Sequence, residues 1–505
     1  MKEKFYITTP IYYVNDKPHI GHAYTSIACD VLARFMRLDG RKVKFLSGTD
    51  EHGQKVEQTA AKLNTTPQKL ADENSEHFRE LLKTLNISND DFIRTTEERH
   101  KQGAQAFWKV LQKSGYIYSG KYSGWYSVRD EAYYQESELV NGKAPTGADV
   151  EWVEEPSYFF KLSAFQDSLL EFYEKNPNFI APESRRNEVI AFVKSGLKDL
   201  SISRTTFKWG IPVPGDEKHV MYVWLDALAN YLTALGYPFK TEFWPADLHM
   251  VGKDILRFHA VYWPAFLMAA DIDPPLRIFA HGWWTNEGQK ISKSLGNVID
   301  PNELVATYGL DQTRYFLMRE IPFGNDGDFS REKMVTRINA DLANNIGNLA
   351  QRVLSMINKN CDGIVPEFHF EESDKKLLSF AFVQADKIRN EIIYDQHFSR
   401  ALELIGQIAT RANEHIDSNA PWKLKKENPE RMKSVLYTLA ECLRRIGLLL
   451  QPFVPDAAAK LLDQLAIPAD HRLFHTVGAG SALRPGTKLP APEGLFPRWE
   501  EKKPL

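Results

Sequence analysis

The sequence is poor in cysteine and contains no long apolar segment. Its 505 residues include only three cysteines, Cys29, Cys361 and Cys442, which are odd in number and far apart. They exclude a disulfide framework and offer no cysteine pair for a zinc knuckle, and they favour a reducing cytoplasm. No run of about 18 apolar residues is present, which argues against a membrane span. The first residues also lack the apolar stretch of a signal peptide.

The net charge of −3 excludes a general electrostatic attraction for nucleic acid. Any nucleic acid must therefore be bound by local patches and by shape. With 43% apolar residues, the chain can bury a large core. Its length predicts two or three domains.

The first fifty residues have the pattern of strand, helix and strand. Aromatic and β-branched residues predict a strand over 5–13, and apolar residues at helical spacing predict a helix from Ile20 that ends before Gly40. A second strand over 43–47 leads to Gly48-Thr49-Asp50. This order predicts a parallel sheet with right-handed crossovers.

The pattern changes twice along the chain. Between 116 and 219, short aromatic strands and Gly-Pro turns replace the alternation of strand and helix, which returns at Met221-Tyr222-Val223-Trp224. From about Ser330 the pattern is helical. We predict an α/β fold: a Rossmann-like parallel-sheet domain in two halves, 1–115 and 220–329, split by an inserted α+β module, 116–219, and followed by an all-α bundle with a C-terminal tail, 330–505.

The motif Pro18-His19-Ile20-Gly21-His22 stands where the first strand gives way to the first helix. Free backbone N–H groups and the helix dipole favour an anion there, and Gly21 allows a ligand to approach the backbone. His19 and His22 are three apart, so both can face one ligand and donate to phosphate oxygens. Taken alone, the motif is equally consistent with two surface histidines.

A second motif, Lys290-Ile291-Ser292-Lys293-Ser294, is followed by Leu295-Gly296-Asn297. Two lysines with interleaved serines suit a loop that clamps pyrophosphate, because lysine acts as a movable point charge. Taken alone, a solvated basic loop is the better interpretation.

Together, in this order and about 270 positions apart, the two motifs resemble the nucleotide signatures of class I aminoacyl-tRNA synthetases. The resemblance implies ATP with Mg²⁺ as cosubstrate and His19, His22, Lys290 and Lys293 as catalytic residues. Gly252 and Lys253 resemble a nucleotide-contacting turn, with Asp254 as a helix N-cap; a purely structural capping turn is the alternative. The ATP-binding set is then His19, Gly21, His22, Gly252, Lys253, Lys290, Ser292 and Lys293.

Further stretches across the whole chain resemble the methionyl-tRNA synthetase family. The resemblance implies that Asp50 binds the α-amino group and that the methionine site comprises Ile11, Tyr13, Asp50, Trp224, Tyr231, Phe258, His259 and Trp263. A thioether is polarisable and apolar, so aromatic walls suit it. We expect His259 and Trp263 on one helix face. Singly, Trp224 or Phe258 is more consistent with a core residue. Leu228 departs from the proline of some members and puts the local backbone in doubt.

The same resemblance assigns anticodon recognition to Asn348, Arg352 and Trp422 in the helical half. RNA sequence is read by stacking on aromatic rings and by hydrogen bonds to base edges, which these side chains can provide. The partner would be tRNA(Met), including the initiator. Without the resemblance, surface residues and a packed tryptophan would be the preferred interpretation.

Many relatives carry a zinc knuckle in the inserted module, but the corresponding segment here, 122–134, contains no cysteine. Zinc requires about four suitably placed N or S ligands. We therefore predict a module without metal. We also expect a monomer, because the chain ends soon after the bundle, without room for the extra RNA-binding domain that dimerises some relatives; the cysteines favour the cytoplasm.

The predicted function is the ATP-dependent attachment of methionine to its tRNA through a methionyl-adenylate. One alternative is a synthetase for leucine, isoleucine or valine, but these are usually longer; the cysteine enzyme needs pocket zinc. Another is a catalytically inactive RNA-binding scaffold, against which the intact His19, His22, Lys290 and Lys293 argue.

Overall fold

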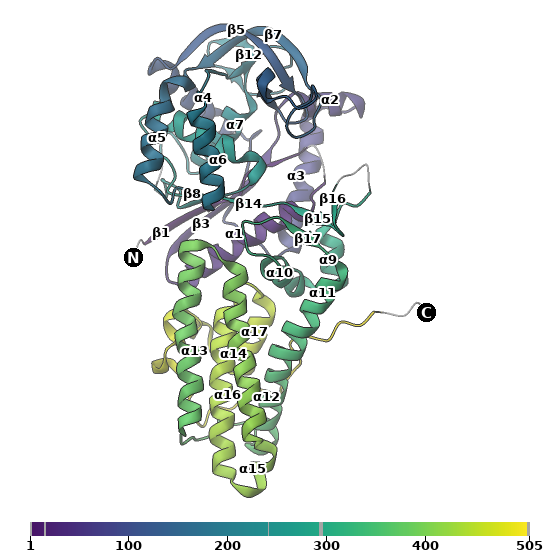
Figure 1. Ribbon diagram of the computed structural model, residues 1–505, viewed down its shortest axis with the longest axis vertical. Coiled ribbons are helices and arrows are strands. Elements are labelled where there is room, and N and C mark those ends of the chain that lie inside the picture. The colour runs from purple at the N-terminus through teal and green to yellow at the C-terminus, as the bar shows by residue number, and fades with distance from the viewer. Residues whose placement is uncertain (1–2, 15–16, 241, 292–295, 502–505) are drawn as a thin grey trace.

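The computed structural model describes residues 3–14, 17–240, 242–291 and 296–501. Its α/β part carries a helical bundle that extends away from it, so the molecule is elongated (Figure 1). No helix within the described residues combines the length and apolarity needed to cross a lipid bilayer.

A parallel sheet forms the centre of the α/β part. Its strands are β1 (Lys4–Thr8), β2 (Tyr12–Tyr13), β3 (Lys42–Asp50), β4 (Asp91–Arg94), β8 (Ile180–Ala181), β13 (Leu248–Gly252) and β14 (Ile278–His281). They follow the order β2-β3-β1-β13-β14-β8, with β4 also paired to β3. The neighbours β1 and β13 come from the two predicted halves of the domain and are parallel. Ligands bind at the carboxyl ends of such strands, where the strand order reverses.

Helices surround this sheet. They are α1 (Ile20–Leu38), α2 (Gln54–Lys62), α3 (Pro67–Thr84), α4 (Glu98–Lys113), α7 (Val223–Thr233), α8 (Trp263–Ala269), α9 (Pro301–Tyr308), α10 (Leu310–Arg319) and α11 (Arg331–Arg337). Helix α1 is buried along most of its length, so it is the central helix of the core. Several helices begin with an N-cap side chain and proline at the first position, as α3 does with Thr66 and Pro67.

The inserted segment forms a separate antiparallel sheet in the order β6-β5-β7-β9. Its strands are β5 (Ile117–Ser127), β6 (Ala132–Tyr134), β7 (Glu151–Phe160) and β9 (Leu200–Ser201), with helices α5 (Gln166–Lys175) and α6 (Glu183–Lys194) after β7. A second small sheet contains β10 (Ser203–Arg204), β11 (Pro212–Val213) and β12 (Asp216–Met221). The segment also supplies β8, which pairs with β14 at the edge of the main sheet. The limits 116–219 stay a prediction, and this contribution to the main sheet was not foreseen.

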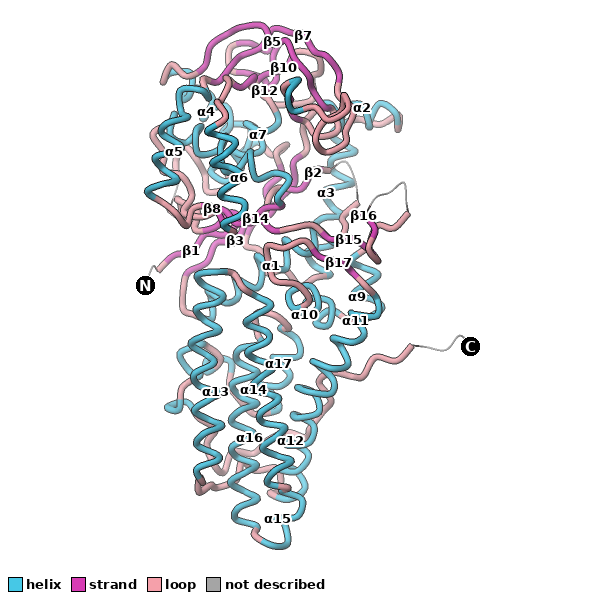
Figure 2. The backbone as a smooth tube through the Cα atoms, in the orientation of Figure 1, coloured by secondary structure: helices cyan, strands magenta, loops and turns pink. Residues whose placement is uncertain are grey.

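The bundle consists of long helices packed side by side (Figure 2). They are α12 (Asn348–Asn360), α13 (Glu372–Asn390), α14 (Phe398–Asn419), α15 (Pro421–Glu427), α16 (Pro429–Leu450) and α17 (Pro455–Gln464). Helix α16 is buried on nearly every side and is the axis of the bundle. The short helix α15 lies at the end farthest from the parallel sheet (Figure 1).

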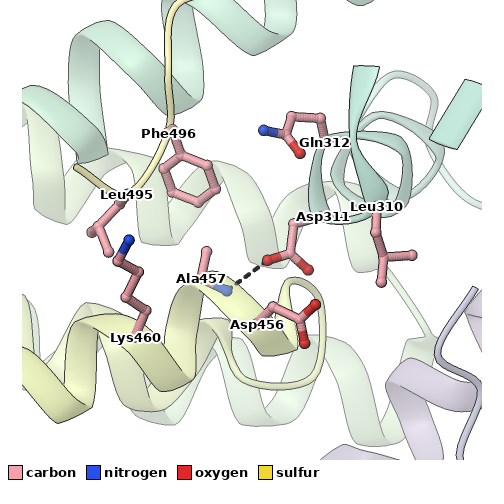
Figure 3. Close-up of a pocket in the computed structure, with 8 residues that line it drawn as sticks. All are labelled: Leu310, Asp311, Gln312, Asp456, Ala457, Lys460, Leu495 and Phe496. Atoms are coloured by element: carbon pink, nitrogen blue, oxygen red, sulfur yellow. Dashed lines mark hydrogen bonds between the residues drawn. The ribbon is translucent and has the colours of Figure 1, made fainter. Parts of the chain in front are cut away.

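Helix α10 joins the bundle to the sheet domain. The fully buried Arg314 donates to an Asp30 carboxylate oxygen of α1 at 2.7 Å and to the Phe453 carbonyl of the bundle at 2.9 Å. One turn earlier, Asp311 accepts the Ala457 N–H at the start of α17, 2.6 Å away, beside a small pocket (Figure 3). The two parts are therefore connected through buried polar contacts.

Candidate functional site

The two histidines of the first motif cap helix α1. His19 is the N-cap, and its Nδ1 accepts from the Gly21 N–H at 3.0 Å; the His19 N–H donates to Nδ1 of His22 at 3.1 Å. A Cβ on residue 21 would lie 2.9 Å from the His19 ring, so this packing needs glycine. The backbone N–H groups of His19 and Gly21, expected to be free for an anion, are instead bonded to imidazoles.

Because the caps use Nδ1 of His19 and of His22, Nε2 of each ring can still bind a ligand. Because each Nδ1 accepts a hydrogen bond, the proton of the neutral ring is on Nε2 in both histidines. Burial, with the neighbouring His19, lowers the pKa of His22 well below its usual value. The ring centroids are 3.9 Å apart. Neutral N–H donors therefore lie side by side at the start of α1.

Of the second motif, Ser292 and Lys293 lie outside the described residues, as does the side chain of Lys290. The structure does describe the residues on either side of this loop. Strands β15 (Trp284–Asn286) and β16 (Gln289–Lys290) form a hairpin, and the Asn286 side chain donates to the Asn297 carbonyl at 2.9 Å. After the loop, the Ile299 carbonyl accepts the N–H of Ile20, the first residue of α1, at 3.1 Å. The start of α1 is therefore hydrogen-bonded to the segment that follows the second motif.

Gly252 and Lys253 lie at the carboxyl end of β13, beside β1. Nζ of Lys253 contacts both carboxylate oxygens of Asp326, at 2.8 and 2.6 Å. Gly252, not Asp254, occupies the N-cap position of the short helix over 253–255, so that expectation was wrong. The Asp254 carboxylate instead accepts from the Trp283 indole at 3.1 Å.

An aromatic cluster lies between α7 and the segment before α8. Trp224 stacks on Phe258 with ring centroids 3.8 Å apart and an interplanar angle of 5°. The Tyr231 hydroxyl contacts Nε2 of His259 at 2.7 Å, while Nδ1 of His259 faces the Ile255 carbonyl at 2.9 Å. The carbonyl can only accept, so Nδ1 carries the proton and Tyr231 donates to Nε2.

The turn that carries Phe258 and His259 is not α-helical as predicted. Residues Phe258–Tyr262 form a π-helical turn, in which the Trp263 N–H bonds the Phe258 carbonyl. Pro264, at the start of α8, lacks an N–H and cannot continue α-helical bonding. π-Helical turns are frequent at functional sites. Trp263 is fully buried behind Tyr231, with ring centroids 6.1 Å apart.

Asp50 ends β3 beside Tyr13 of β2, its register partner. The side chain is buried, and its Oδ1 has no hydrogen-bond partner among the described residues. Burial, followed by the charges of Asp226, Glu131 and Glu51, raises its pKa well above the usual value. A buried carboxylate in this state is stabilised by an incoming cation. Ile11, in the connection between β1 and β2, is half-buried.

The proposed anticodon residues lie together at the bundle. Asn348 begins α12 and is exposed. The Arg352 guanidinium, one turn later, lies 5.5 Å from the Trp422 ring centroid and pairs with Asp417 at 2.6 Å. Trp422, in α15, is 47% exposed. The structure thus brings an amide, a guanidinium and an indole to one surface.

Comparison with known proteins decides the family. The model described as tRNA synthetases class I (M) matches residues 5–151 and 137–354, and that of the anticodon binding domain of methionyl tRNA ligase matches residues 374–504. The chain belongs to the methionyl-tRNA synthetases. It is 60% identical to a methionine–tRNA ligase of Rickettsia felis, over 99% of both chains. It is 59% identical to that of Brucella suis, again over 99% of both chains.

Solved structures agree. The Mycobacterium tuberculosis methionyl-tRNA synthetase in complex with methionyl-adenylate superposes with a TM-score of 0.96 at 51% identity, covering 98% of this chain and 100% of that one. The free form of the same enzyme gives 0.89 at 48% identity, covering 99% of each. These matches confirm the expected Rossmann-like core and helical anticodon domain.

Sequence reasoning missed a buried charged group beside the candidate methionine site. Asp226 of α7 is fully buried and contacts His52 Nδ1 and His100 Nε2, each at 2.7 Å. Burial opposes its ionisation, yet the two histidines lower its pKa to about 2. The contact with His52 fixes α7, which carries Trp224 and Tyr231, next to Asp50. Its only signal in the sequence was one aspartate in a largely apolar helix.

Proposed function

We propose that the residues grouped around the start of α1 carry out both chemical steps of methionine–tRNA ligation. As a methionine–tRNA ligase, this chain forms methionyl-adenylate from methionine and ATP and then transfers methionine to the tRNA 3′ end. The observation that supports the site assignment is the hydrogen bond from the Ile20 N–H to the Ile299 carbonyl, because it brings the start of α1, in the histidine motif, next to the segment that follows the lysine loop.

In the first step the methionine carboxylate attacks the α-phosphorus of ATP and pyrophosphate leaves. His19 and His22 donate from Nε2 to the phosphate oxygens as their charge grows; the geometry of the caps supports this role. Lys290 and Lys293 would hold the departing pyrophosphate, together with Ser292. Mg²⁺ enters as part of the substrate, bound to the ATP phosphates, whose charge it offsets.

Gly21, Gly252 and Lys253 complete the proposed ATP site at the carboxyl ends of β1 and β13. Lys253 is held by Asp326 in the structure. It must exchange this partner for a substrate oxygen when ATP binds. Because Asp326 is more than half exposed, solvent screening makes this exchange cheap.

The methionine side chain would lie among the aromatic residues. Trp224, Phe258 and Trp263 supply apolar walls, while Tyr231 and His259 supply the polar groups. Asp50 would bind the ammonium group through its unpartnered oxygen. Ile11, between β1 and β2, and Tyr13, in β2, would complete the pocket.

Asn348, Arg352 and Trp422 would read the anticodon of tRNA(Met), including the initiator. Trp422 is exposed and offers a stacking surface, and Arg352 can stack or donate to a base edge. Arg352 would leave Asp417 on binding.

The inserted module would need no zinc. The carboxylate of Asp130 accepts hydrogen bonds from Tyr134 and Thr146, and Arg129 contacts both Asp130 and Thr146. This network ties the β5–β6 turn to the loop before β7, as a metal would. We expect Asp130→Ala to lower the melting temperature, whereas a zinc-selective chelator, added with Mg²⁺ in excess, has no effect on melting or activity. Stoichiometric zinc in the purified protein would contradict this part of the proposal.

We further propose that the protein works as a monomer in the cytoplasm. Its three cysteines are all unpaired, as a reducing compartment requires. Sedimentation at micromolar concentration would test the monomer, and a fluorescent fusion would test the location.

The test of function is ATP–pyrophosphate exchange with methionine, run beside leucine, isoleucine, valine and cysteine, followed by charging of tRNA(Met). Exchange with methionine alone, and charging, is the expected result. Exchange with another amino acid would identify a different specificity, and tRNA binding without exchange would identify an inactive scaffold.

A further inference from the structure

The inserted module sends one buried carboxylate into the proposed methionine site. Glu131 lies in the turn between β5 and β6 and is 5% exposed. Its Oε1 accepts from the Tyr13 hydroxyl at 3.0 Å and from the Lys55 N–H at 3.3 Å. Its other oxygen accepts from the Tyr126 hydroxyl. The carboxylate thus contacts two elements of the sheet domain from a different sheet.

The backbone of Glu131 is also unusual. Its φ of 49° lies in the left-handed region, where glycine or asparagine is the favoured residue. The Tyr222 hydroxyl holds the Glu131 carbonyl at 2.9 Å. The carboxylate is thus held by three hydrogen bonds and the backbone by a fourth, so the position of Glu131 is well defined.

In the sheet domain, Gly53 leaves room for the contact between Glu131 and Tyr13. Gly53 has a φ of 117°, and a Cβ there would lie 2.8 Å from Oε1 of Glu131 and 3.0 Å from the Tyr13 hydroxyl. Only glycine therefore permits the approach of both groups. Tyr13 in turn is the register partner of Asp50 on adjacent parallel strands. A shift of the Tyr13 ring would reach the ammonium site directly.

We propose that Glu131 is a positioning residue of the methionine site, which fixes the Tyr13 ring against Asp50 through the Tyr13 hydroxyl. The inference rests on the proposed function and extends it, because it makes the inserted module part of the amino-acid site. In this proposal the β5–β6 turn of the module positions a side chain of the methionine site.

The experiment compares Glu131→Ala, Glu131→Gln and Tyr13→Phe by methionine-dependent ATP–pyrophosphate exchange. Glu131→Ala removes the acceptor and should raise KM for methionine about tenfold, because the Tyr13 ring is no longer held beside Asp50. KM for ATP and kcat should change less than about twofold, since the phosphate contacts are untouched. Glu131→Gln keeps an acceptor for Tyr13 and can donate to Tyr126, so it should restore most of the affinity.

A double-mutant cycle tests the route through Tyr13. If Glu131 acts by holding that hydroxyl, Tyr13→Phe and the double variant should show the same KM as Glu131→Ala. The inference would be overturned if the methionine KM of the double variant rose by the product of the two single effects. It would also be overturned if Glu131→Ala left the methionine KM unchanged. If Glu131→Ala melts below the assay temperature, Glu131→Asp replaces it, because the shorter side chain breaks the same contact.

Asp130→Asn on the same turn is the matched control. It weakens the network with Tyr134 and Thr146 but has no contact with Tyr13 among the described residues. It should lower the melting temperature and leave the methionine KM unchanged. An equal rise in KM would show that Glu131 acts only through module stability, which also overturns the inference. Wild-type protein without methionine-dependent exchange would instead overturn the proposed function.

Discussion

The pocket proposed for methionine is buried, whereas the surface proposed for the anticodon is open to solvent. Tyr231 and His259 are 1% and 2% exposed and are hydrogen-bonded to one another. Trp422 is 47% exposed, and Arg352 pairs with an exposed aspartate. A buried, preformed pocket discriminates small ligands through desolvation and unpaired polar groups. An exposed surface must order its side chains when RNA binds, so each of its contacts contributes less net energy.

The largest loss of activity is expected from removing a donor to the phosphate oxygens, on which negative charge grows during the reaction. His22→Ala should lower kcat of methionine-dependent exchange by about 100- to 1000-fold, the usual cost of losing one oxyanion donor. Methionine binding should change much less, because the His22 ring packs on His19, Tyr12 and Phe78 and not on the aromatic residues proposed for the thioether. Stopped-flow or exchange kinetics measure the first quantity and equilibrium dialysis the second. Equal losses in both would contradict the assigned role.

Asp50→Asn should act on binding rather than on chemistry. Losing the charged partner of the ammonium group should raise KM for methionine about 100-fold, with KM for ATP unchanged. Since the pKa of Asp50 is raised, protonation competes with methionine at a higher pH than for an ordinary aspartate. Methionine KM should therefore rise as pH falls, and this dependence should vanish in Asp50→Asn. A pH-independent wild type would contradict the assignment.

Trp422→Ala tests whether the anticodon surface acts independently of the methionine site. Loss of one stacking surface should lower kcat/KM for tRNA about 10- to 100-fold, while ATP–pyrophosphate exchange stays at the wild-type rate. Phe380, a bundle residue that stacks on Arg411, gives a control variant, Phe380→Ala, that should leave both activities unchanged. Reduced exchange in Trp422→Ala would show that the bundle is not energetically separate.

The smallest effect concerns Asp417, the partner of Arg352. Exposed ion pairs contribute about 0–1 kcal/mol, so Asp417→Ala should release Arg352 and improve tRNA affinity by no more than about threefold. Filter binding at low salt can resolve this change. Weaker binding in the variant would mean that Asp417 orients Arg352 for RNA instead of competing with it.

Local patterns predicted the elements well. Helix α1 begins at Ile20 and ends before Gly40, as its apolar spacing indicated. The strand predicted over 5–13 is instead divided into β1 and β2, because Pro10 cannot donate in the ladder. The π-helical turn before Pro264 could not be derived from a spacing of three and four residues.

Contacts between distant residues were beyond such patterns. The sequence shows Asp226, His52 and His100 as unrelated polar residues, and only folding makes them one buried group. The same holds for Glu131 and Tyr13, which are 118 positions apart. The capping of α1 by imidazoles was missed because histidine is not a typical N-cap residue.

A crystal structure with a non-hydrolysable methionyl-adenylate analogue tests the central claim most directly. The account predicts the ammonium group on Asp50, the thioether between Trp224 and Tyr231, and the phosphate within hydrogen-bond distance of Nε2 of His19 or His22. An analogue bound with its phosphate away from the start of α1 would contradict it.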